Sequence, residues 1–71
     1  MVVDHQLIGK VGRVIGTIEP GKLGEIMIAI RGGHESYYAY ASGQEERIEK
    51  GTRVVVIDQD APRTVTVSRL A

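Results

Sequence analysis

Glycines divide a chain rich in β-branched residues into short segments, and this combination limits the folds that the chain can adopt. Val and Ile supply 17 of the 71 residues, Leu supplies three, and nine glycines recur along the sequence. β-Branched side chains suit a pleated strand and are mildly unfavourable in a helix. No stretch keeps a helical period over three turns. The sequence therefore predicts an all-β protein.

Residues 24–31 show the clearest strand pattern. Isoleucines occupy every second position and would share one face: Ile26, Ile28 and Ile30. Strict alternation indicates a strand with one buried side. The Gly32-Gly33 pair that follows can supply the positive φ angles of a two-residue hairpin turn. We expect the partner strand to begin directly after this turn.

Four further strands are expected, at residues 10–18, 34–41, 52–58 and 64–70. Gly12 and Gly16 inside the first of them predict a bulge or bend, which lets one strand pair in two sheet directions. Residues 19–22 have the Pro and Gly positions of a type II turn. Residues 54–57 form an unbroken β-branched run, which indicates a strand covered on both sides or at a barrel corner.

Five short strands separated by turns indicate a small barrel, since closure removes exposed strand edges. The longest link, between the third and fourth strands, suits the crossover of a Greek-key barrel. We predict a five-stranded OB-fold barrel over residues 7–71, after a flexible segment at residues 1–6. An SH3-like barrel is the alternative.

The third expected strand and the link after it raise two questions about the core: which face of the strand is buried, and whether Ile48 is buried. Tyr37 with Ala39 and Ala41 is expected to face inward, and the opposite face with Tyr38 is the rival. Ile48 is the apolar residue of a charged link and is expected to plug the edge of the core. A short helical turn over residues 44–47 is a further possibility.

Composition excludes several classes of function. The chain has no cysteine, and its nine basic and nine acidic residues give zero formal net charge. Disulfides, thiolate metal sites and bulk attraction to nucleic acid or anionic lipid are therefore not expected. No apolar run reaches the length of a membrane span. His34, Glu35 and Ser36 do not form a triad, because successive strand residues point to opposite faces. We expect no metal, no cofactor and no enzymatic activity.

One strand face is the candidate binding surface. Tyr38 and Tyr40 lie two residues apart, hence on one face, in the region where OB barrels often bind ligands. Packing of both rings over the barrel is the first interpretation, protein contact the second. Single-stranded nucleic acid is the third, because Glu25 and Glu35 would lie nearby. The candidate partner-binding residues are Met27, Arg31, His34, Tyr38 and Tyr40.

Four segments together resemble the C-terminal domain of NfeD-like proteins. They are residues 7–12 (LIGKVG), 20–24 (PGKLG), 38–41 (YAYA) and 48–56 (IEKGTRVVV). Each segment alone is a common barrel pattern, and their order and spacing carry the resemblance, which extends from about Leu7 to Ser68.

The resemblance implies an OB-fold domain that normally follows membrane-spanning helices, which this chain lacks. It implies a non-catalytic module that works with a stomatin- or flotillin-like membrane protein, at the cytoplasmic face of the cell membrane. Two other functions stay open on the residues alone: a single-stranded nucleic-acid-binding domain, and a structural barrel that self-associates.

Overall fold

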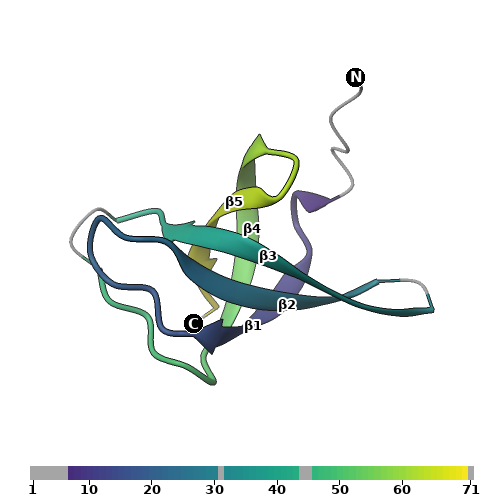
Figure 1. The fold of residues 1–71 in the computed structure, drawn as a ribbon, viewed down its shortest axis with the longest axis horizontal. Helices are drawn as coiled ribbons and strands as arrows, with labels where there is room; N and C mark the ends of the chain where they lie inside the picture. Colours follow the sequence, from purple (N-terminus) through teal and green to yellow (C-terminus); the bar gives the residue numbers. More distant parts are fainter. Residues whose placement is uncertain (1–6, 31, 44–45, 71) are drawn as a thin grey trace.

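Five strands make up most of the computed structural model, which describes residues 7–30, 32–43 and 46–70 (Figure 1). The strands are β1 (Val11–Gly16), β2 (Gly24–Ile30), β3 (Gly33–Ala41), β4 (Arg53–Ala61) and β5 (Thr64–Arg69). The all-β prediction is therefore confirmed. The expected flexible segment at residues 1–6 lies outside the described residues. Within the described ranges, no helix is long and apolar enough to cross a bilayer.

The strands close into a barrel in the order β1-β2-β3-β5-β4, with β4 pairing back onto β1. Only the β3–β5 pair among these strand pairs is parallel. Figure 1 shows β2 and β3 running together across β4 and β5. Strand β5 lies between β3 and β4 in the sheet, so the link from β3 to β4 is a crossover, as the predicted Greek key requires. The five-stranded OB-type barrel is confirmed.

Strand β1 bends as its glycines predict. It pairs with both β2 and β4, and its register with β2 shifts between Val14 and Gly16. The strand ends at Gly16, two residues earlier than expected, and Ile18 instead forms an isolated bridge with Ile48. In the turn that follows, the Lys22 amide donates to the Glu19 carbonyl at 2.9 Å, and Gly21 has a φ of 71°. The type II prediction is confirmed.

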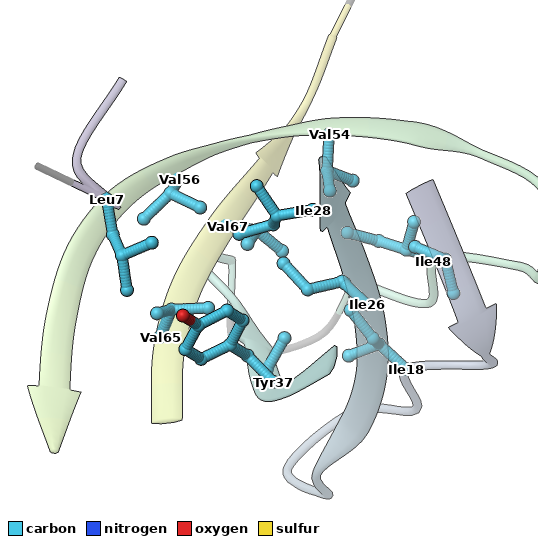
Figure 2. Close-up of a cluster of buried hydrophobic side chains, with 12 residues drawn as sticks. Leu7, Ile18, Ile26, Ile28, Tyr37, Ile48, Val54, Val56, Val65 and Val67 are labelled. Atoms are coloured by element: carbon cyan, nitrogen blue, oxygen red, sulfur yellow. The ribbon is translucent and has the colours of Figure 1, made fainter. Parts of the chain in front are cut away.

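The core is aliphatic apart from one tyrosine, and Figure 2 shows its side chains converging inside the barrel. Tyr37 is 7% exposed and Ala39 is fully buried, whereas Tyr38 is 53% exposed, so the expected face of β3 is inward. Ile48 is fully buried although it lies in a polar link. The buried residues are Leu7, Val14, Ile18, Ile26, Ile28, Tyr37, Ala39, Ile48, Val54, Val56, Val65 and Val67.

The structure differs from the sequence predictions at the hairpin turn, at the end of β4, in the β-branched run and at the possible helical turn. Gly33 is the first residue of β3 and pairs with Ile30, so the hairpin turn is not the Gly32-Gly33 pair. Strand β4 continues to Ala61 through two register shifts with β5, beyond the expected end at residue 58. Ile57 is 45% exposed, so coverage on both sides is wrong for the β-branched run, and the alternative of a strand at a barrel corner stays a prediction. The possible helical turn falls partly at residues 44–45, outside the described residues, and residues 46–47 are not helical.

Candidate functional site

The outer face of the β2–β3 hairpin holds three of the predicted binding residues. Because Ile26, Ile28 and Tyr37 point into the core, the residues between them point outward. In the register of the two strands, residues directly opposite one another form three outward pairs: Glu25 with Tyr38, Met27 with Ser36, and Ala29 with His34. Met27, His34 and Tyr38 therefore share one face. Arg31 lies outside the described residues.

The two outward tyrosines line separate hollows. Tyr38 borders a shallow depression with Leu23 and Glu25. Tyr40, 40% exposed, borders a second one with Thr66 and the turn at residues 19–21. Both tyrosines pair with β5, Tyr38 with Thr64 and Tyr40 with Thr66, but only Tyr38 also has a partner on β2. Neither ring is buried by the barrel, so both present apolar surface and a hydroxyl to a potential partner.

A third hollow lies over β1 and β2 and contains Met27 and His34. Its lining combines apolar side chains with three basic ones and no acidic one: Val11, Gly12, Arg13, Ile15, Met27, Ala29, His34 and Arg53. Arg13 is directly opposite Met27 on one side and directly opposite Arg53 on the other. The hollow thus brings two of the predicted residues, Met27 and His34, together with two arginines.

The Arg13–Arg53 pair is electrostatically unfavourable for the isolated barrel. Like charges directly opposite each other on neighbouring strands destabilise a sheet, while opposite charges stabilise it by about 0.2–1 kcal/mol. Replacing Arg53 by Glu is therefore expected to raise the free energy of unfolding by about 0.5–1 kcal/mol. Urea denaturation measures this change, and added salt should reduce it because the side chains are solvent-accessible.

The matched comparison for this stability gain is Arg53→Gln, which removes the repulsion without creating an attraction. It should give a smaller increase than Arg53→Glu. A loss of stability in both variants would show that the Arg53 side chain contributes packing or hydrogen bonding that outweighs the repulsion.

Catalytic and metal-binding constellations are not formed by the described residues. Over these residues, no group of three or more His, Cys, Asp or Glu side chains is placed to hold a metal ion. The Glu35 carboxylate accepts a hydrogen bond from the Tyr37 hydroxyl at 2.9 Å and forms an ion pair with Arg63 at 3.4 Å. Arg63 in turn lies over the Tyr37 ring. Glu35 is thus engaged away from His34 and Ser36, and cannot orient the histidine as a triad acid would.

Arg53 was not among the residues predicted to bind a partner, although it lines the same hollow as Met27 and His34. The signal that places it is the β1–β4 register, which closes the barrel between segments far apart in the chain. No turn connects these two strands, so no local pattern could fix which residues lie opposite each other.

Comparisons with known proteins agree on one family. The family model of the NfeD C-terminal domain matches residues 11–68. The solution structure of the soluble domain of the NfeD protein YuaF from Bacillus subtilis is similar, with a TM-score of 0.76 and 30% identity, over 90% of this chain and 74% of that one.

A second solved structure is similar over its whole length. It is the C-terminal domain of stomatin operon partner protein 1510-C from Pyrococcus horikoshii, with a TM-score of 0.72 and 32% identity. The match covers 100% of this chain and 98% of that chain. No curated protein matches the chain.

Proposed function

Since this chain belongs to the NfeD C-terminal domain family, we propose that it is a non-catalytic interaction module that binds a stomatin- or flotillin-like protein. The observation that carries the proposal is the end-to-end similarity to the C-terminal domain of a stomatin operon partner protein. The barrel would act as a rigid scaffold that presents strand faces to the partner. It would do so at the cytoplasmic face of the cell membrane, as the soluble domain of an NfeD-like membrane protein.

The outer face of β2 and β3 is the proposed contact surface, with Met27, His34, Tyr38 and Tyr40 as its described residues and Arg31 as a further member. Tyrosines offer large contact area at a low cost in side-chain entropy, and they are frequent among the residues that dominate binding energy. Glu25 lies directly opposite Tyr38. A carboxylate at this position would repel the phosphates of a strand stacked on the ring, which favours a protein partner over single-stranded nucleic acid.

Partner capture tests this function. The immobilised chain is incubated with detergent-solubilised membranes, and the bound proteins are identified by mass spectrometry. A stomatin- or flotillin-like protein should be enriched, and the double variant Tyr38→Ser/Tyr40→Ser should reduce its recovery on the order of tenfold. Ile57→Ser is the matched control, because it also removes an exposed apolar side chain but from β4.

Three results would contradict the proposal. One is equal recovery of such a protein by the double variant and the wild type, and another is no enrichment at all. The third is that short single-stranded DNA or RNA binds through the tyrosines with log affinity falling linearly with log salt concentration. Sedimentation at increasing chain concentration reports whether this face mediates self-association instead.

A further inference from the structure

The arginines that the structure describes fall into two groups according to their partners. Three of them form ion pairs with glutamates: Arg47 with Glu49 at 3.8 Å, Arg63 with Glu35 at 3.4 Å, and Arg69 with Glu46 at 2.6 Å. Within the described part of the chain, Arg13 and Arg53 form no ion pair with a carboxylate. The Arg13 guanidinium donates to the Gly51 carbonyl at 3.3 Å. The two described arginines that lack an acidic partner therefore lie directly opposite each other on β1 and β4.

This place is also apolar and open to solvent. Both arginines border the hollow over β1 and β2, whose other walls include Val11, Met27 and Ala29. Val11, the first residue of β1, pairs with Val55 of β4, and its side chain is 41% exposed. The formal net charge of the chain is zero. The hollow, which two arginines and no acidic residue line, is therefore a local excess of positive charge.

We propose that the hollow lined by Arg13, Arg53 and Met27 is the docking site for a short acidic segment of the partner protein. One carboxylate of that segment would lie between the two guanidinium groups and relieve their mutual repulsion. A neighbouring aliphatic side chain would cover Val11 and Ala29. The proposal rests on the proposed function and deepens it, since it names the surface and the chemistry that the partner must supply.

Charge and shape favour an acidic peptide over other anionic ligands. Nucleic acid and anionic membranes are bound through many phosphate contacts, which need an extended basic surface. Here the basic groups of the hollow are two arginines and His34, and Glu25 borders the adjacent depression. Guanidinium groups pair with carboxylates in a bidentate geometry, and the gain is larger where apolar contacts exclude water from the pair.

Titration with a synthetic peptide tests the proposal. The probe is a short peptide in which Glu and Leu share one side of an extended chain, and its counterpart has Gln in place of every Glu. Binding is followed by amide NMR shifts of the chain and by fluorescence anisotropy of the labelled peptide. The amide signals of Arg13, Arg53 and Ala29 should shift together and saturate, and the Gln counterpart should not reproduce these shifts.

Charge reversal supplies the decisive variant and its control. Arg53→Glu should weaken binding of the acidic peptide on the order of tenfold or more, because the new carboxylate takes the place of the ligand opposite Arg13. Arg47→Glu changes the net charge equally but lies in the polar link, and it should leave the affinity within about twofold of the wild type. Arg53→Gln should be intermediate, and the amide spectrum shows directly that each variant is folded.

The proposal is overturned if both charge reversals weaken binding equally, or if the Gln counterpart binds as well as the acidic peptide. It is also overturned if oligo-dT or phosphatidylglycerol vesicles occupy the hollow more tightly than the peptide does. The capture experiment separates this proposal from the general function. If Arg53→Glu and the wild type recover equal amounts of a stomatin-like protein, the hollow is not the docking site, but the proposed function stands. If the acidic peptide binds and no stomatin- or flotillin-like protein is captured, the proposed function is wrong, but the hollow still binds acidic segments.

Discussion

Replacement of Ile48 by alanine is expected to lower the free energy of unfolding by about 2–5 kcal/mol, the range for truncation of a fully buried isoleucine. Ile48 is fully buried and comes from the long link between β3 and β4. Its amide and carbonyl both bond to Ile18, each at 2.9 Å. Because a chain this short buries a small core, a loss of this size should leave a large unfolded fraction at room temperature.

Urea denaturation followed by circular dichroism measures this effect, with Ile57→Ala as the control. Ile57 is the same residue type, but its side chain is 45% exposed on β4. Its truncation should cost less than about 1 kcal/mol, the span of strand propensities. If both variants lose similar stability, Ile48 does not plug the barrel as its burial indicates, and the link would contribute little to the fold.

The strands with one buried side could be predicted because each strand pattern is local. Ile26 and Ile28 occupy alternate positions of β2, so the pleat places both side chains on the same face, which is the one that enters the core. Tyr37 follows from the same logic once β3 is paired with β2. Ile48 could be predicted because an aliphatic side chain among charges gains most by burial.

Register between distant strands could not be predicted, because no local pattern encodes it. Arg13 and Arg53 lie opposite each other only because β1 pairs with β4 when the barrel closes. The hollow that they share could therefore not be predicted from the sequence. The predicted position of the hairpin turn was wrong by one residue, because either of two adjacent glycines could supply the positive φ angle that the turn needs. Strand β4 continues past Asp58 because its bulges keep polar residues paired with β5, and polar residues near a turn signal gave no indication of this.

Replacement of Gly24 by alanine is expected to destabilise the barrel by about 2–3 kcal/mol, the upper part of the range for overpacking a tight site. A Cβ atom at this position would lie 2.7 Å from the Gly16 carbonyl oxygen and 2.8 Å from the Ile18 Cα, and nearer still to the Ile18 Cγ1. Two of these atoms are backbone, so no rotation of a side chain relieves the clash. The first strand and the turn after it would have to move away from β2.

Gly33→Ala is the matched control, since Gly33 is also at the start of a strand. A Cβ atom there would meet nothing within 4 Å, and Gly33 is not among the glycines with positive φ. Alanine reduces the freedom of the unfolded chain, so this variant should be neutral or more stable by up to about 1 kcal/mol. The difference between the two Gly→Ala variants therefore isolates the close approach of β2 to the end of β1 from the general effect of adding a methyl group. Equal unfolding midpoints would mean that the strands do not approach this closely, and that the bend at Gly16 rather than the contact at Gly24 sets the curvature of the barrel.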